Sequence, residues 1–289
     1  MVNSILRNWK FGDNQWTMGD FPRLMGIVNV TPDSFSDGGI HQSVNSAIKH
    51  ALNLADQGAD ILDIGGESTR PGAKSVSENQ ELERVIPVIE RLSSLTEVPI
   101  SIDTMKSAVA KEAIQAGAII VNDVSGLEFD REMPSLCAET NVGVICMHMK
   151  GNPQTMQDQP EYENVCKEIT EYLTGRIEFL KQNGISQERI VIDPGVGFGK
   201  TAEHNLEIMK NISTFRKTGS PVLIGHSRKR FLSKVIGRKV DERLAGTIGV
   251  SIALAMQNVD IIRVHDIQAV KESLIAWKSL TDGAPLSFE

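Results

Sequence analysis

Polar side chains close eight short apolar runs of the chain. The runs occupy residues 24–30, 59–64, 99–103, 118–122, 142–148, 189–193, 221–226 and 260–265. Groups that can bind or move charge end them: Asn29, Asp63, Asp103, Asn122, Asp123, His148, Asp193, His226, Arg263 and His265. Carboxylate, amide, guanidinium and imidazole groups suit the recognition of a polar ligand. If the runs are strands of one closed parallel sheet, these groups meet at a single mouth.

Each apolar run is followed by a stretch with helical periodicity. Apolar residues such as Val44 and Ile48 recur at helical spacing after the first run, and Ser77 with Gln80 has the spacing of a helix capping box. Later helices are expected near residues 107–116, 131–139, 162–182, 203–217, 242–256 and 269–280. Eight strand–helix alternations predict an α/β fold, the (β/α)₈ TIM barrel, and a doubly wound open sheet is the main competitor.

The chain length suits one such barrel. Its 289 residues compare with roughly 250 in a typical barrel, so we expect a single domain over residues 1–289, with the barrel at 24–280. Residues 8–18 place aromatic side chains on both sides of an Asp-Asn turn. We therefore expect a β-hairpin within residues 1–20 that plugs the amino-terminal end of the barrel.

Composition and charge exclude several classes of protein. The formal net charge of -7 disfavours a nucleic-acid binder, which needs a broad cationic face. No run reaches the ~18 apolar residues of a membrane span, and the first residues lack the apolar centre of a signal peptide. The three cysteines are Cys137, Cys146 and Cys166. Their spacing fits neither a disulfide framework nor a zinc site, which favours reduced thiols in the cytoplasm.

Two carboxylates and an amide at strand ends could bind a planar heterocycle. Asp103, Asn122 and Asp193 provide acceptors and one group that both donates and accepts. An amino-pyrimidinone edge presents adjacent N–H donors that suit a carboxylate. Asp63 and Asp123 fit equally well as partners of internal ion pairs.

A basic segment follows the seventh run. Residues 225–230 read GHSRKR, and residues 263–266 after the eighth run read RVHD. Loops after the last two strands of such barrels commonly form a phosphate site. We expect Lys229 to point inward, whereas Arg228 and Arg230 could as easily be solvated surface charges.

Asn29 ends the first run, opposite the basic segment. Its neutral oxygen suits Mg²⁺, which keeps most of its waters and binds through few protein groups together with substrate phosphates. The sequence thus offers a magnesium ligand beside the expected phosphate site.

Other common site types are excluded. Residues 193–201, DPGVGFGKT, do not have the glycine spacing of a P-loop or of a dinucleotide fingerprint, so a tight strand-to-helix turn is favoured. No serine stands in a nucleophile-elbow context, and no zinc-protease or EF-hand pattern occurs. The long polar connections at residues 31–43 and 65–77 are expected to be lids over the mouth.

Longer motifs resemble a known family. They read MGIVNVTPDSFSDGG (25–39), DIGGESTRPGA (63–73), SIDT (101–104), NDVSG (122–126), MHMKG (147–151), DPGVGFGK (193–200), GHSRKRF (225–231) and RVHD (263–266). Together they closely resemble the dihydropteroate synthases of the pterin-binding family, in the monofunctional bacterial type. The resemblance spans essentially the whole chain from residue 24 onward.

The resemblance implies a transferase of folate synthesis. It would condense (7,8-dihydropterin-6-yl)methyl diphosphate with 4-aminobenzoate to give 7,8-dihydropteroate and diphosphate, with Mg²⁺ as cofactor. Sulfonamides would be competitive inhibitors, and the protein would be a homodimer. Two alternatives stay open: a pterin-dependent methyltransferase on the same barrel, and a paralogue that binds pterin without catalysis.

The resemblance also implies roles for individual residues. Catalysis would rest on Lys229, Asp103, Arg263 and His265, and Asn29 would bind the metal. The pterin diphosphate would contact Thr69, Arg70, Asp103, Asn122, Met147, Asp193, Gly225, Lys229, Arg263, Val264 and His265. The 4-aminobenzoate would contact Phe35, Thr69, Pro71, Phe198, Lys229 and Arg230. Residue 230 is serine in other members. The carboxylate of 4-aminobenzoate would therefore be anchored here either by Arg230 or by backbone N–H groups at the following helix start.

Overall fold

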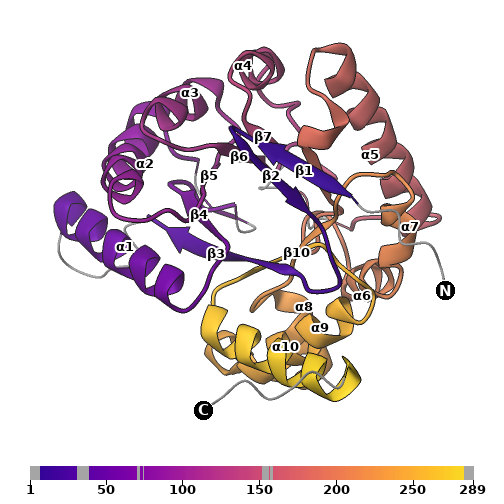
Figure 1. The fold of residues 1–289 in the computed structure, drawn as a ribbon. Helices are drawn as coiled ribbons and strands as arrows, with labels where there is room; N and C mark the ends of the chain where they lie inside the picture. Colours follow the sequence, from indigo (N-terminus) through magenta and orange to yellow (C-terminus); the bar gives the residue numbers. More distant parts are fainter. Residues whose placement is uncertain are drawn as a thin grey trace.

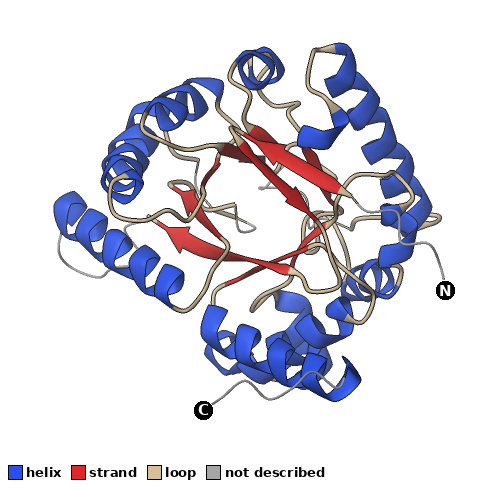
Figure 2. Ribbon diagram, viewed as in Figure 1, coloured by secondary structure: helices blue, strands red, loops and turns tan. Residues whose placement is uncertain are grey.

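A closed parallel sheet surrounded by helices forms the body of the molecule. The computed structural model describes residues 7–30, 39–69, 72–73, 75–151, 156 and 159–282. Eight strands lie in one sheet, and the helices form a ring outside it (Figures 1 and 2). The fold is the expected (β/α)₈ TIM barrel. Within the described residues, no helix is both long and apolar enough to cross a membrane.

The barrel strands all run parallel. They are β3 (Arg23–Asn29), β4 (Ile61–Gly65), β5 (Ile100–Asp103), β6 (Ile120–Asp123), β7 (Gly143–Met147), β8 (Ile190–Asp193), β9 (Leu223–Gly225) and β10 (Ile261–Val264). Their order in the sheet is β8-β7-β6-β5-β4-β3-β10-β9. An isolated parallel bridge between Ile192 and Val222 joins β8 to β9. This β8–β9 seam closes the barrel.

The helices follow the strands as expected, with two differences. They are α1 (Gly39–Asp56), α2 (Glu78–Ser93), α3 (Ser107–Gln115), α4 (Met133–Glu139), α5 (Val165–Gln182), α6 (Ala202–Lys210), α7 (Ile212–Arg216), α8 (Arg230–Ile236), α9 (Leu244–Ala255) and α10 (Ile267–Asp282). The single helix expected at 203–217 is wrong: it divides at Asn211, whose Nδ2 donates to the Glu207 carbonyl at 2.8 Å. α8 is an additional helix before α9. The capping box at Ser77 and Gln80 is confirmed.

The amino-terminal hairpin plugs one end of the barrel. Strands β1 (Asn8–Phe11) and β2 (Asn14–Thr17) pair antiparallel and cross that end (Figure 1). Trp9 is fully buried, and its indole Nε1 donates to the Arg189 carbonyl at 3.1 Å. The plug packs with Phe11, Met18, Met25, Ile61, Ile120, Ile145, Val191, Leu223 and Ile261. The predicted plug is therefore confirmed.

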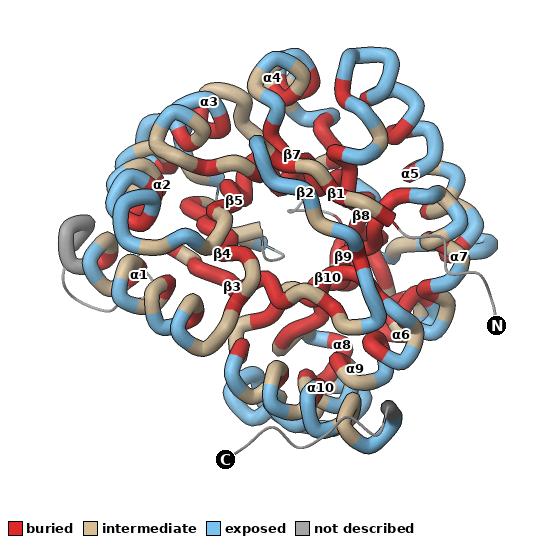
Figure 3. The backbone as a smooth tube through the Cα atoms, viewed as in Figure 1, coloured by how far each residue is buried: buried red, intermediate tan, exposed pale blue. Residues whose placement is uncertain are grey.

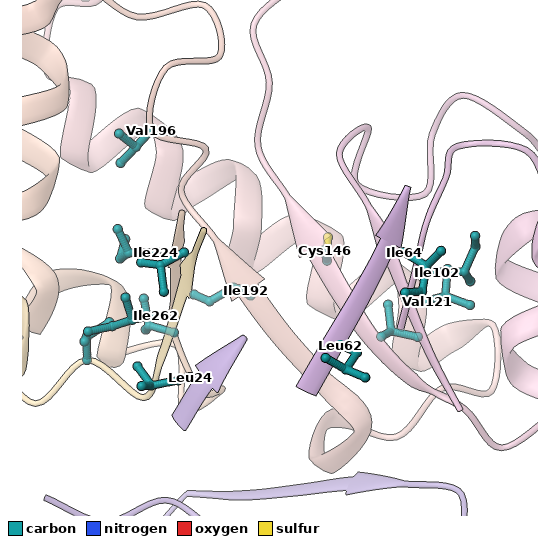
Figure 4. Packing of buried hydrophobic residues seen from close by; sticks show 14 of the residues in the cluster. Leu24, Leu62, Ile64, Ile102, Val121, Cys146, Ile192, Val196, Ile224 and Ile262 are labelled. Carbon is teal, nitrogen blue, oxygen red and sulfur yellow. The ribbon is translucent and has the colours of Figure 1, made fainter. Parts of the chain in front are cut away.

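A second and larger core lies between the sheet and the helices. It takes the outward side chains of the strands, including Leu62, Ile64, Ile192 and Ile262, some of which are drawn in Figure 4. The strands are buried while the outer faces of the helices are exposed (Figure 3). Because neighbouring residues of a strand point to opposite faces, a strand buried on both sides reads as a continuous apolar run.

Candidate active site

Strand alternation decides which polar residues enter the barrel. In β4, Ile61 belongs to the inner cluster and Leu62 and Ile64 to the outer core, which leaves Asp63 facing inward. The same alternation turns the side chain of Arg263 in β10 inward. It also gives the inward direction to Asp103, Asn122, Met147 and Asp193. All of these positions lie at the carboxyl ends of their strands, on the side away from the hairpin.

Arg263 links two carboxylates inside the mouth. Its Nε donates to Asp63 Oδ2 at 2.6 Å, and its Nη2 donates to Asp103 Oδ2 at 2.7 Å. Asn122 Nδ2 donates to the same oxygen of Asp63 at 3.1 Å. Asp63 is fully buried, so it is a positioning partner at the base of this network. The network fixes two carboxylates, an amide and a guanidinium from four strands.

Lys229 lies on the other side of the mouth. Its Nζ donates to the Val196 carbonyl and stands 4.4 Å from the centroid of the Phe198 ring, a cation–π contact. Asp193 is 7% exposed, and its Oδ1 accepts from the Gly195 amide at 2.7 Å. One cation therefore stands near a carboxylate and against an aromatic wall.

Burial shifts the proton affinities of these groups. It raises the pKa of Asp103 to about 7 against the opposing charge of Arg263. It also raises the pKa of Asp193, which Lys229 opposes. Burial lowers the pKa of Lys229 to about 8, against Asp193. Groups that change charge near neutral pH in one concave region are a mark of an active site.

The segments after β9 and β10 are joined by a second network. Ser227 Oγ lies 3.0 Å from His265 Nδ1 and accepts from the His265 amide at 3.2 Å. Arg228 pairs with Asp266 through Nε and Nη2, at 3.0 Å and 2.5 Å. Arg228 has a φ of +55°, a left-handed conformation that is uncommon for a residue with a side chain. This turn directs Arg228 to Asp266 and Lys229 to the mouth.

Asn29 and His265 border a cavity of about 640 Å³ that Arg228 and Asp266 also line, and the rest of its lining comes mainly from α1 and α10 outside the barrel. Within the described residues, no cluster of three or more histidine, cysteine or acidic side chains could hold a metal ion. A cation bound at Asn29 would therefore depend on ligands other than such a cluster, namely water and phosphate oxygens.

Apolar side chains form one wall of the mouth. Val124, Met147, Met156 and Phe198 make a separate buried cluster at the strand ends. Met147 is 2% exposed and Phe198 is 9% exposed. The wall suits the flat face of an aromatic ring, next to the polar groups that would hold its edge.

The segment after β8 is the tight turn expected from its glycines. Gly195 has a φ of +72°, and a Cβ there would lie 1.9 Å from the His148 carbonyl oxygen, so only glycine fits. The turn leads into α6, whose first residues are capped by Thr201. Its hydrogen bonds are made to the protein's own groups.

The remaining candidates have different placements. Asp123 Oδ1 accepts from the amide and hydroxyl of Ser125, so it serves the local turn. Val264 is fully buried in the outer core, and only its backbone could face a ligand. Thr69 is half-buried and Gly225 is buried beside Arg263, whereas Arg230 is exposed at the start of α8. Phe35, Arg70, Pro71 and most of the expected lid at 31–43 lie outside the described residues.

Three contributors to the site were not given roles from the sequence. The sequence pattern leaves Asp63 open between ligand binding and internal pairing, and it assigns no role to Ser227 or to Lys200, which lies within the expected turn. Asp63 carried a signal, because an inward acid on a buried strand requires a partner. Ser227 and Lys200 act through groups far away in the sequence, so no local pattern could identify them.

The fold and the site are those of a TIM barrel with polar groups and an apolar wall gathered at one mouth, and we compared the chain with known proteins. The family model described as "Pterin binding enzyme" matches residues 25–265. The chain therefore belongs to the pterin binding enzyme family.

Relatives within that family are dihydropteroate synthases. The Escherichia coli K12 protein of that name is 44% identical over 253 residues, covering 88% of this chain and 89% of its own. Among solved structures, Xanthomonas albilineans dihydropteroate synthase with 4-aminobenzoic acid has a TM-score of 0.89 at 42% identity, covering 97% of this chain and 100% of its own. The Yersinia pestis synthase with a sulfonamide drug has a TM-score of 0.88 at 38% identity, covering 96% and 100%.

Proposed function

We propose that this chain is a dihydropteroate synthase, a transferase of folate synthesis. It condenses (7,8-dihydropterin-6-yl)methyl diphosphate with 4-aminobenzoate and releases dihydropteroate and diphosphate. The observation that carries the proposal is the placement of Arg263 between Asp63 and Asp103, in the same mouth as Asp193 and Lys229. The relatives that match this chain over most of their length are named dihydropteroate synthases. They do not support a methyltransferase or a non-catalytic paralogue.

The pterin is held by its polar edge. Asp193 and Asn122 take the N–H donors and the acceptor of the amino-pyrimidinone ring, since carboxylates and amides match that edge in pairs. Asp103 stands beside them with its position set by Arg263. Met147 supplies an apolar contact for the ring face. The side chains named lie at the ends of strands, which are rigid elements.

The 4-aminobenzoate lies outside the pterin, against Phe198 and Lys229. The contact of the Lys229 ammonium with the Phe198 ring supports this placement, because it fixes both walls of a slot. Thr69, Phe35 and Pro71 complete the slot in our proposal, which for Phe35 and Pro71 rests on the family resemblance alone. Arg230, exposed one residue after Lys229, can pair with the carboxylate, as can backbone amides there. Sulfonamides would compete for the same slot.

The diphosphate lies toward Asn29 and His265. In our proposal Arg263 and Arg70 offer it positive charge, and His265 and Thr69 offer hydrogen-bond donors. Asn29 fits Mg²⁺, since it gives a neutral oxygen beside the phosphate site and leaves the remaining positions to water and phosphate. The ion would neutralise charge on the leaving diphosphate when it is bound.

The reaction begins with loss of diphosphate. The bond between the exocyclic methylene and the diphosphate oxygen breaks with both electrons going to oxygen, and the electron-rich pterin stabilises the methylene cation. The arylamine nitrogen then bonds to the methylene and loses one proton. An aromatic amine is uncharged at neutral pH, so little base is required. This chain's residues contribute field, orientation and exclusion of water.

We also propose a cytoplasmic location and a homodimer. The three cysteines are buried free thiols, which suits a reducing compartment. Exposed apolar side chains at the end of α8, at the start of α9 and in the segment between them support self-association: Val235, Ile236, Val240 and Leu244, with Met256 exposed at the end of α9. Light scattering of the wild type and of Met256→Glu tests the dimer, which the charged variant should weaken.

The function is tested by mixing the pterin diphosphate, 4-aminobenzoate and Mg²⁺ with the protein. Dihydropteroate and diphosphate should form in equal amounts, and omission of any component should stop or strongly slow their formation. Absence of dihydropteroate from the complete mixture would rule the function out.

A further inference from the structure

Lys200 is a buried cation that the reaction, as described, does not use. It ends the turn after β8 and is 2% exposed. Its Nζ lies 2.8 Å from the Phe198 carbonyl oxygen, 3.3 Å from the His148 carbonyl oxygen and 3.0 Å from His148 Nδ1. An ammonium has three N–H groups, so three acceptors satisfy it. A buried charge without such partners would be strongly unfavourable.

These contacts fasten the turn to the end of β7. Phe198 belongs to the turn, while His148 directly follows Met147 at the strand end. The same turn carries the Val196 carbonyl that accepts from Lys229. A single side chain thus connects the Phe198 wall, the Met147 wall and the acceptor that holds Lys229.

The charge of Lys200 also acts on Asp193. Burial lowers the pKa of Lys200, and Asp193 opposes this. Asp193 in turn has Lys229 and Lys200 among the cations that favour its ionised form. Burial, and then Lys200, lower the pKa of His148 to about 2. With Lys200 as an ammonium, the neutral ring accepts at Nδ1 and carries its proton on Nε2.

We propose that Lys200 is a positioning residue for the condensation, holding the turn that carries Phe198 against the end of β7 through its contacts with His148 and the Phe198 carbonyl. This inference rests on the proposed function. Without Lys200, the aminobenzoate slot loosens and water reaches the methylene cation. Water oxygen then bonds to the methylene, loses a proton, and hydroxymethyl-dihydropterin forms in place of dihydropteroate.

The test compares Lys200→Met with Lys210→Met, an exposed position on α6. In the holoenzyme with Mg²⁺, diphosphate and dihydropteroate are measured together. Lys200→Met should lower kcat/KM for 4-aminobenzoate by about tenfold to a hundredfold, as misplacement in an active site can. It should also release more diphosphate than dihydropteroate, whereas Lys210→Met should keep the two equal. A folded Lys200→Met enzyme with equal products and an unchanged KM overturns the inference.

A second variant covers failure to fold. His148→Phe keeps a ring against Tyr172, which His148 contacts edge-on at 4.8 Å between centroids, and removes one acceptor of Lys200. It should shift both readouts in the same direction by a smaller factor. If Lys200→Met does not fold and His148→Phe behaves as wild type, Lys200 serves the fold only and the inference fails. Wild-type enzyme that makes no dihydropteroate would instead refute the proposed function.

Discussion

Arg263 and Asp103 are in contact although two other strands lie between the strands that carry them in the sheet. Arg263 Nη2 lies 2.7 Å from Asp103 Oδ2, while β4 and β3 stand between β5 and β10. The pair therefore crosses the inside of the barrel, and Asp63 of β4 completes it. One guanidinium sets the positions of two acids, which gives it more influence on the site than a single contact would.

Loss of that guanidinium should damage both activity and stability. Arg263→Ala should lower kcat/KM by about a hundredfold or more, because positioned donors for developing charge contribute on this scale. It should also lower the free energy of unfolding by about 3–5 kcal/mol, since buried Asp63 loses its cation. Initial rates and urea unfolding measure the two effects. Arg91→Ala, at an exposed position of α2, is the control, and equal rates for the two variants would contradict the prediction.

The ammonium of Lys229 should matter for turnover. Lys229→Ala removes the contacts with Val196 and Phe198 and should lower kcat/KM by about a hundredfold. Lys167→Ala, at a side chain that is 70% exposed, should have little effect. Steady-state rates with both substrates varied compare the variants, and similar rates would remove Lys229 from the mechanism.

Activity should have a bell-shaped pH dependence. Asp103 binds as a carboxylate only above its pKa of about 7, and Lys229 is an ammonium only below its pKa of about 8. The value of kcat/KM should therefore rise through the first pH and fall through the second, as apparent values of the coupled site. In Lys229→Arg the alkaline fall should move to higher pH, because arginine stays charged. An unmoved alkaline limb would assign it to another group.

Ser227 should act through His265. Ser227→Ala removes the hydroxyl that contacts the His265 ring and amide, and kcat/KM for the pterin diphosphate should fall about tenfold, the scale of a lost hydrogen bond at a charged group. The KM for 4-aminobenzoate should stay within about twofold. Ser213→Ala, exposed on α7, serves as the matched control. An equal effect on both substrates would show that Ser227 does not act selectively on the diphosphate side.

The hairpin plug should contribute stability rather than chemistry. Trp9→Ala empties a fully buried volume below the strands and should lower the free energy of unfolding by about 3–5 kcal/mol. The folded fraction should keep its kcat, since the plug lies at the opposite end from the mouth. Gln15→Ala on exposed β2 should leave the unfolding midpoint unchanged. A large loss of kcat without loss of stability would refute this division.

The strands and the location of the site were predictable because they depend on local pattern. Apolar runs that end in Asp103, Asn122 or Asp193 identify buried parallel strands, and parallel strands bring their carboxyl ends to one face. The plug followed from the aromatic residues around a turn. The division at Asn211 and the additional helix α8 were not predicted. Asn211 donates to the Glu207 carbonyl and the Ile212 amide donates to the distant Gln257, while α8 begins without a side-chain cap that could have indicated it.

Partner choice was the part that sequence could not provide. Asp63 and Asp123 both lie at the ends of buried apolar runs of the sequence. In the structure, the alternation of side chains in β6 turns Asp123 outward to Ser125, whereas Asp63 points inward to Arg263. Similarly, three consecutive cations gave no sign that Arg228 would pair with Asp266 and leave Lys229 for the mouth. The partners of Asp63 and Arg228 are distant in the chain and meet them only in the folded barrel.

The β8–β9 seam has a consequence for how substrate and protein support each other. Asp193 ends one strand of the seam and Lys229 follows the other, so a pterin bound by both, as proposed, would span a joint of the wall that is closed by an isolated bridge. Its binding would hold the two strands of the seam together. The site would then be most rigid with ligand bound, because the ligand would complete the wall of the barrel against which it binds.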